Sequence, residues 1–173
     1  MAPRVAETSA TQLLHDVAIV APPIDLQRIA QHLKLVVAYE PLVNDVSGML
    51  LRRNERAVVA VNASHPAQRQ RFTIAHEIGH FKLHTGIYID KDTRINARTS
   101  RSSSGLDPDE VQANAFAAEL LMPRGMVVHE FTRRVRTGSR SVDAIVADLA
   151  RSFDVSTQAM EIRLKVVGAL APF

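Results

Sequence analysis

The sequence His76-Glu77-Ile78-Gly79-His80 constrains the fold of this chain more than any other segment. Two histidines four residues apart lie on the same side of an α-helix, with Cβ atoms about 5–6 Å apart. At that spacing two imidazoles can bind one Zn²⁺, with Zn–N distances of about 2.0–2.1 Å. Glu77 is turned by about 100° from His76, so it can reach water beside the metal without being a ligand. The motif therefore predicts a helix with a catalytic zinc site, in which His76 and His80 are ligands and Glu77 is the general base.

The residues around the motif predict a helix with one buried side. Ser64 and Pro66 favour a helix start, and the helix should extend to about His84. The apolar positions of this segment are Phe72, Ile74, Ile78, Phe81 and Leu83. Polar motif residues on a buried helix are costly unless they serve a purpose. Histidines at the surface, or hydrogen-bonded in the core without a metal, are the weaker interpretation.

Two other residues of this helix admit more than one role. Gly79 costs about 1 kcal/mol of helix stability relative to alanine. It either leaves room for close backbone approach beside the metal or serves simple helix packing, and the sequence favours neither. His84 continues the four-residue spacing, but residues 76 and 84 are about 12 Å apart along a helix axis. We therefore expect His84 to support the site rather than to bind the same ion.

A catalytic zinc usually has three protein ligands, and Glu110 is the best candidate for the third. Asn114 follows one helical turn later and could hydrogen-bond a ligand. However, Asp107 and Glu110 also match a capping box, in which the glutamate only completes the helix N-terminus. From spacing alone the two roles of Glu110 have equal weight. Glu119 should point to the opposite side of the same helix.

The pattern of apolar residues predicts an α+β fold. We expect helices over 7–21, 24–33, 64–84, 110–121, 124–136, 141–152 and 156–167, and strands over 35–39, 47–52, 57–61, 86–90 and 93–97. The strands should form a small, mainly antiparallel sheet beside the helix that carries the motif, and the C-terminal half should be helical. Residues 57–62 are the expected sheet edge for an extended peptide.

Length and composition fit one domain. With 173 residues, 46% of them apolar, the chain can bury one core. We expect a single metallopeptidase domain over 1–173, with an N-terminal helix (1–23), a catalytic core (24–123) and a helical C-terminal subdomain (124–173). The chain has no cysteine, so a metal must be bound by His, Asp or Glu.

Charge and hydropathy indicate an ordinary soluble protein. The net charge of +3 permits a nucleic-acid partner without requiring one. No segment reaches the roughly 20 apolar residues of a membrane helix, and the N-terminus lacks the layout of a signal peptide. We expect a cytoplasmic protein with no membrane partner.

Three segments together resemble the ImmA/IrrE family of metallopeptidases. These are RFTIAHEIGHFKLH (71–84), EVQANAFAAELLMP (110–123) and LARSFDVSTQAMEIRL (149–164). The resemblance implies a zincin-like fold with one Zn²⁺ per chain, bound by His76, His80 and Glu110, and Glu77 as the catalytic glutamate. It also implies a zinc-dependent endopeptidase that cleaves a helix-turn-helix transcriptional repressor. Such cleavage relieves repression in a stress response, a mobile element or a toxin–antitoxin-like pair.

Two alternatives belong to other functional classes. Residues 141–167 can be read as a helix-turn-helix, which would make the chain a DNA-binding regulator. Residues 124–173 hold eight basic and five acidic side chains, which is a weak excess for that purpose, so we expect no direct binding of nucleic acid. The other alternative is a protein-binding regulator with a non-catalytic metal site.

Overall fold

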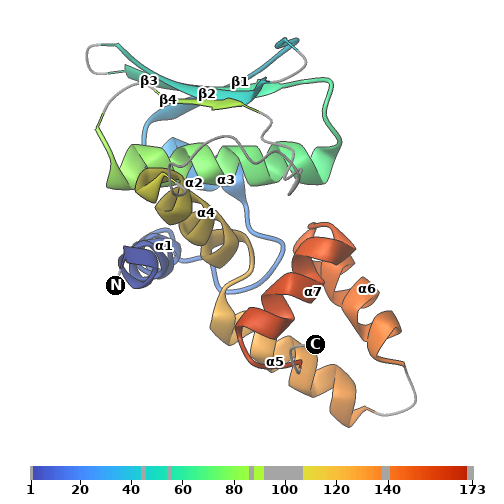
Figure 1. The fold of residues 1–173 in the computed structure, drawn as a ribbon. Coiled ribbons are helices and arrows are strands. Elements are labelled where there is room, and N and C mark those ends of the chain that lie inside the picture. Colours follow the sequence, from blue (N-terminus) through green and yellow to red (C-terminus); the bar gives the residue numbers. More distant parts are fainter. Residues whose placement is uncertain are drawn as a thin grey trace.

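The computed structural model describes residues 2–43, 46–53, 56–85, 88–91, 107–137 and 141–170. It confirms the expected α+β class. Figure 1 shows a small sheet on one side of the long helix α3 (Ala67–Leu83), with α4 (Pro108–Leu121) crossing the other side of α3. Helix α1 (Ala2–Asp16) packs against α4, and the three C-terminal helices form a separate group at the other end of the molecule.

The sheet has four strands in the order β1-β3-β2-β4. They are β1 (Leu35–Glu40), β2 (Val46–Arg53), β3 (Arg56–Asn62) and β4 (Tyr88–Lys91). The β2–β3 and β2–β4 pairs are antiparallel and the β1–β3 pair is parallel, so the sheet is mainly antiparallel as predicted. The predicted strand at 93–97 lies outside the described residues.

The predicted sheet edge at residues 57–62 is wrong. Strand β3 lies inside the sheet, between β1 and β2, while β1 and β4 occupy the two edges among the described strands. Residues 57 and 59–62 are all buried. A nearly continuous run of buried residues is typical of an interior strand, and the sequence AVVAVN already has that character.

The main core fills the space between the sheet and α3. Leu50 and Val59 are directly opposite each other in the sheet and are fully buried, together with Ile74 and Ile78 of α3. Helix α2 (Leu26–His32) extends this core beside β1, and Asp25 caps its N-terminus by accepting a hydrogen bond from the Arg28 amide.

Helix α1 is displaced toward the N-terminus relative to the predicted range 7–21. It begins at Ala2 and ends at Asp16, well before the two prolines that were expected to stop it. The cause is local, because Ala18 adopts a left-handed backbone conformation with φ 53°. The amides of Ala18 and Ile19 then donate to the carbonyls of His15 and Leu14, which closes the helix C-terminus.

The C-terminal helices are α5 (Arg124–Arg136), α6 (Val142–Phe153) and α7 (Thr157–Val166), close to their predicted ranges. Two arginines make polar contacts between these helices and the rest of the chain. Buried Arg163 of α7 binds the carboxylate of Glu119 and the carbonyl of Met122. Arg71 of α3 donates to the carbonyl of Asp154, in the turn between α6 and α7. None of the described helices has the length and apolar character needed to cross a membrane.

Candidate metal centre

His76, His80 and Glu110 form the candidate metal centre, in which one donor atom of each lies within 4.8 Å of the others. The two histidine Nε2 atoms are 3.0 Å apart. Glu110 Oε2 is 3.2 Å from His76 Nε2, and Glu110 Oε1 is 3.3 Å from His80 Nε2. The two histidines are almost fully buried, whereas the Glu110 side chain is 39% exposed. The structure thus brings together the three predicted ligands, of which Glu110 is partly accessible to solvent.

The close crossing of α3 and α4 places Glu110 near the histidines. Gly79 faces the α4 backbone, where a Cβ atom at this position would lie 3.1 Å from Ala113 Cα and 3.3 Å from Phe116 Cβ. Ala113 is one turn after Glu110, and Gly79 lies between the two histidines in sequence. The small residue therefore serves helix packing, and that packing sets the distance between the ligands.

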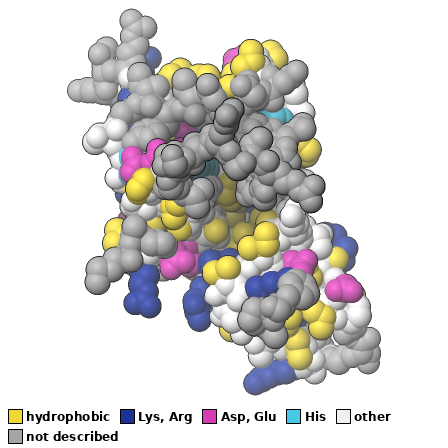
Figure 2. Space-filling view, viewed as in Figure 1, with side chains coloured by type: hydrophobic (Ala, Val, Ile, Leu, Met, Phe, Trp, Pro, Cys, Tyr) yellow, Lys and Arg dark blue, Asp and Glu magenta, His cyan; other side chains and the backbone are white. Residues whose placement is uncertain are grey.

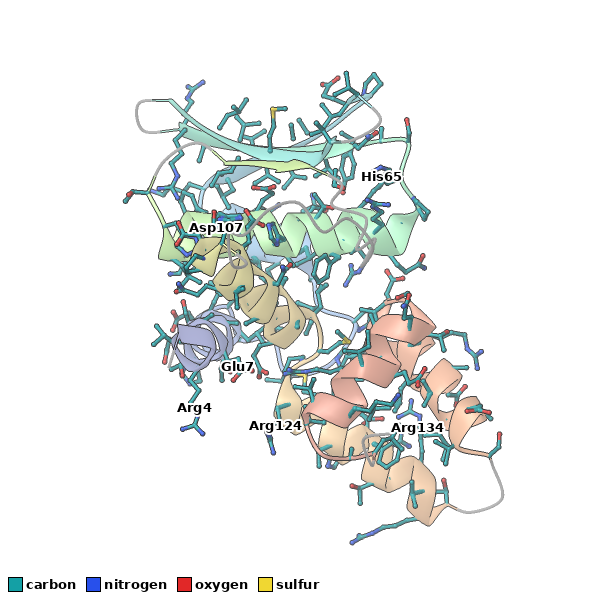
Figure 3. All side chains as sticks on the ribbon, viewed as in Figure 1. Arg4, Glu7, His65, Asp107, Arg124 and Arg134 are labelled. Carbon is teal, nitrogen blue, oxygen red and sulfur yellow. The ribbon has the colours of Figure 1, made fainter. Side chains whose placement is uncertain are left out.

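Glu110 does not complete a capping box within the contacts that the structure gives. The Asp107 side chain caps α4 by accepting from the Asp109 amide at 3.0 Å, while the Glu110 carboxylate faces the two imidazoles. Figure 3 labels Asp107 where the start of α4 meets α3. Hydrogen bonds from His76 and then His80 hold the pKa of Glu110 well below its ordinary value. An ionised carboxylate at this position is ready to bind a cation.

Each histidine of the centre has a partner at its other ring nitrogen. His76 Nδ1 lies 3.1 Å from Asn114 Oδ1, as the spacing of Glu110 and Asn114 led us to expect. His80 Nδ1 lies 3.0 Å from His84 Nδ1. Ligand histidines in metal sites commonly donate from the second nitrogen, which fixes the tautomer and the ring orientation. If a cation binds between the two histidines and Glu110, both Nε2 atoms can then present lone pairs to it.

Glu77 is fully buried between α3 and the sheet. Strand β2 passes directly over it at Gly48, where an added Cβ would lie 3.6 Å from Glu77 Oε1 and only 2.4 Å from Thr73 Cγ2. A register shift between Val46 and Gly48 marks an irregularity in the β2–β4 pairing at this point. The strand irregularity and the absent side chain let the sheet approach the helix at the level of Glu77.

The residues present fit a zinc ion. Two imidazole nitrogens and one carboxylate are the donor set of the two-histidine, one-glutamate class of catalytic zinc sites. The chain has no cysteine, so thiolate sites do not compete with this assignment. A general base would be Glu77, which neighbours His76 in sequence but is not among the three clustered donors.

Two supporting residues were not predicted from the sequence. Gly48 had a detectable signal, because a glycine inside a strand often marks a bulge or a close approach of backbone. Arg52 had none, because its role depends on how β2 lies over the end of α3. Its guanidinium donates to the carbonyls of His80, Phe81 and His84, which closes the C-terminal turn of the motif helix. Glu119 lies away from the centre, as predicted, and binds Arg163.

An HExxH helix under a small sheet, crossed by a second helix that supplies a glutamate, places the chain in the zincin-like class of metallopeptidase folds. The sequence profile of the IrrE N-terminal-like domain matches residues 30–165, which include all four candidate site residues. The chain belongs to this family. The family thus agrees with the resemblance that the three sequence segments indicated.

Two curated relatives come from the genus Deinococcus, and both are named radiation response metalloprotease IrrE. The protein from Deinococcus deserti is 34% identical over 102 residues, which are 59% of this chain and 34% of the relative. The protein from Deinococcus radiodurans is 32% identical over 103 residues, which are 59% of this chain and 29% of the relative. The matched region thus spans about a third of the length of these relatives.

Proposed function

We propose that this protein is a zinc-dependent endopeptidase that cleaves a helix-turn-helix transcriptional repressor in the cytoplasm. The observation that supports this most is the convergence of His76, His80 and Glu110 on one point, with Glu77 buried beside His76. The names of the two relatives support a protein substrate. The repressor as substrate follows from the resemblance to the ImmA/IrrE family.

In this proposal the chain's own residues divide the chemistry between binding and proton transfer. His76, His80 and Glu110 hold one zinc ion per chain, which supplies a Lewis acid for the scissile carbonyl and increases the acidity of water. Glu77 accepts the proton of the attacking water at its carboxylate and delivers it to the leaving amide nitrogen. Burial of Glu77 favours this transfer, because water that would otherwise solvate the carboxylate is excluded.

We propose that the substrate chain lies along β4. This strand is at the sheet edge among the described strands, and it also contacts α3. An extended peptide could add to that edge through main-chain hydrogen bonds. The test is a series of peptides, each methylated at one amide nitrogen near the cleavage site. Cleavage should be lost in every second peptide of the series, because only alternate amides of an added strand donate to β4. Equal cleavage of all methylated peptides would contradict this mode of binding.

The competing DNA-binding interpretation receives less support. The turn between α6 and α7 faces α3 through the Arg71–Asp154 contact, and Arg163 of the would-be recognition helix is buried against Glu119. Figure 2 shows the described Lys and Arg side chains of this face scattered over the molecule rather than gathered in one patch. Tight binding to duplex DNA that weakens steeply with added salt would revive this interpretation.

The direct test is cleavage of a candidate helix-turn-helix repressor, chosen from the genes that flank the gene for this chain. Zinc-loaded wild type should cut it at a defined bond, as read by intact mass. Glu77→Gln should reduce the rate of cleavage by about 10²–10⁴-fold, which is the usual contribution of a general base. Glu161→Gln, on α7 and outside the site, is the matched control and should cut at the wild-type rate.

Equal rates for wild type and Glu77→Gln would refute the proposed role of Glu77. A stable zinc-dependent complex without cleavage would favour the protein-binding alternative.

A further inference from the structure

His84 occupies the position immediately after α3 and lies against His80. The two rings have their centroids 5.1 Å apart and meet through their Nδ1 atoms at 3.0 Å. His80 presents its other nitrogen, Nε2, to Glu110 and His76. One ring of His80 thus connects the candidate metal centre with a second imidazole.

The direction of the hydrogen bond follows from the chemistry of the ring. If His80 Nε2 is to bind a cation, its lone pair must be available, so the ring proton lies on Nδ1. His80 Nδ1–H therefore donates, and His84 Nδ1 accepts. The proton of neutral His84 is then on Nε2, which lies 3.5 Å from Asp109 Oδ1. His80 and His84 thus meet through their Nδ1 atoms, and the charge of the nearby Asp109 carboxylate favours the tautomer of His84 that carries its proton on Nε2.

The environment holds His84 in this orientation. Its side chain is only 7% exposed. Arg52 donates to the carbonyl of His84 at 2.8 Å and to that of His80 at 3.0 Å, and its guanidinium lies 5.0 Å from the centroid of the Phe81 ring. The backbone of the last turn of α3 is thereby fixed, so the imidazole of His84 is presented to His80 from a rigid base.

The two ligand histidines therefore depend on different kinds of acceptor. His76 faces the neutral amide of Asn114, which α4 supplies four residues after Glu110. His80 faces an imidazole, which can accept at Nδ1 only in the tautomer that carries its proton on Nε2. Asp109 favours that tautomer. The first turn of α4 thus supplies both a candidate ligand, Glu110, and the residue that orients His84.

We propose that His84 is a positioning residue for the metal centre, which fixes the tautomer and ring orientation of His80 with Asp109 as its own orienting partner. This proposal rests on the proposed metal site but goes beyond it. Partners of this kind usually contribute about 10–100-fold to metal affinity. His84→Ala should weaken zinc binding by that factor, while His84→Gln, whose carbonyl can accept from Nδ1–H, should recover part of the loss.

Two measurements test the proposal together. The first is the zinc dissociation constant from competition with a chromogenic chelator, for wild type, His84→Ala, His84→Gln and Asp109→Asn, with thermal unfolding as a check of folding. The second is the through-hydrogen-bond ¹⁵N–¹⁵N coupling between the His80 and His84 rings in ¹⁵N-labelled protein. We expect a coupling in wild type, its absence in His84→Ala, and a smaller affinity loss for Asp109→Asn than for His84→Ala.

The outcomes separate this proposal from the proposed function. Wild-type zinc affinity in folded His84→Ala would overturn the positioning role and leave the zinc site intact. Equal losses in His84→Ala and His84→Gln, with no coupling in wild type, would also overturn it, because a hydrogen-bond acceptor would then not be what matters. A wild type that binds no zinc would refute the proposed function. The ring coupling in that metal-free protein would still show whether the His80 and His84 rings are hydrogen-bonded.

Discussion

Gly79 of α3 packs against the backbone of Ala113 in α4, and a Cβ atom on Gly79 would lie 3.2 Å from the Ala113 carbonyl oxygen. This contact lies at the centre of the helix crossing that brings Glu110 to the two histidines. The geometry of the candidate site thus depends on a residue that has no chemistry of its own.

We predict that Gly79→Ala weakens zinc binding although alanine is the better helix former. The added methyl group meets two backbone atoms of Ala113 at 3.1 and 3.2 Å and Phe116 Cβ at 3.3 Å, so the two helices must separate by a few tenths of an ångström. Overpacking of about 1–3 kcal/mol opposes a gain of about 1 kcal/mol in helix propensity. Zinc affinity and chemical denaturation would be measured in parallel.

The matched control is Gly125→Ala in α5, where an added Cβ meets nothing within 4 Å. It should raise the free energy of unfolding slightly, by up to about 1 kcal/mol, and leave zinc affinity unchanged. If Gly79→Ala behaves like Gly125→Ala in both measurements, the helix crossing does not set the ligand geometry.

We predict that Gly48→Ala destabilises the protein by about 1–3 kcal/mol. The new Cβ would lie 2.4 Å from Thr73 Cγ2 and 2.9 Å from the Ala60 carbonyl oxygen, so β2 and α3 must move apart beside Glu77. Thr73→Ser removes the nearest methyl group. The double variant should therefore lose less stability than the two single variants combined, and strict additivity would contradict the steric explanation.

The buried pair Arg163–Glu119 should be the strongest polar link between α7 and α4. Arg163→Met leaves the carboxylate of Glu119 buried, where it keeps only the Arg124 amide and the Thr11 hydroxyl among the contacts given for it. Removing one partner of a buried pair usually costs about 3–5 kcal/mol. Urea denaturation would measure the loss.

Lys165→Met provides the control on the same helix, because it breaks the more exposed Lys165–Glu161 pair. Surface pairs four residues apart on a helix contribute about 0.3–0.5 kcal/mol. Similar losses in both variants would contradict the special role of the buried pair.

Acid should release zinc through the histidines rather than through Glu110. The hydrogen bonds from His76 and His80 hold the pKa of Glu110 below its ordinary value, so this carboxylate stays ionised as the pH falls through 4.5. Protonation of the two imidazoles then competes with the metal. The logarithm of the zinc dissociation constant, plotted against pH in the acid range, should have a slope of at most two in magnitude. A slope of three would mean that Glu110 also takes up a proton.

Local patterns predicted most of the fold and the histidine pair of the candidate site. The helix ranges from α2 to α7 agree to within a few residues, because apolar periodicity, prolines and caps are local signals. Glu110 was recognisable as a ligand only in part, since a capping box has the same spacing. The family resemblance, rather than the spacing, gave it more weight.

The features of the fold and the site that the sequence did not predict depend on contacts between distant segments. Strand β3 lies inside the sheet because β1 pairs with it in parallel. Each residue of β3 is opposite a β1 residue 22 positions earlier in the sequence, and no local pattern indicates that pairing. The left-handed Ala18 that ends α1 has no glycine or asparagine to mark it. The packing of Gly79 depends on the placement of α4 against α3, because its partner is Ala113. A supporting position for His84 was expected from its spacing, but its contact with Asp109 of α4 was not.

The most direct test of the central claim is the zinc content per chain of wild type, His76→Ala and Glu110→Ala, determined by elemental analysis after dialysis against a weak chelator. We predict one zinc per chain in wild type and loss or strong weakening in both variants, with folding confirmed by circular dichroism. Absence of zinc from folded wild type even after reconstitution would contradict the metallopeptidase account. Retention of a full equivalent in folded Glu110→Ala would show that Glu110 is not the third ligand.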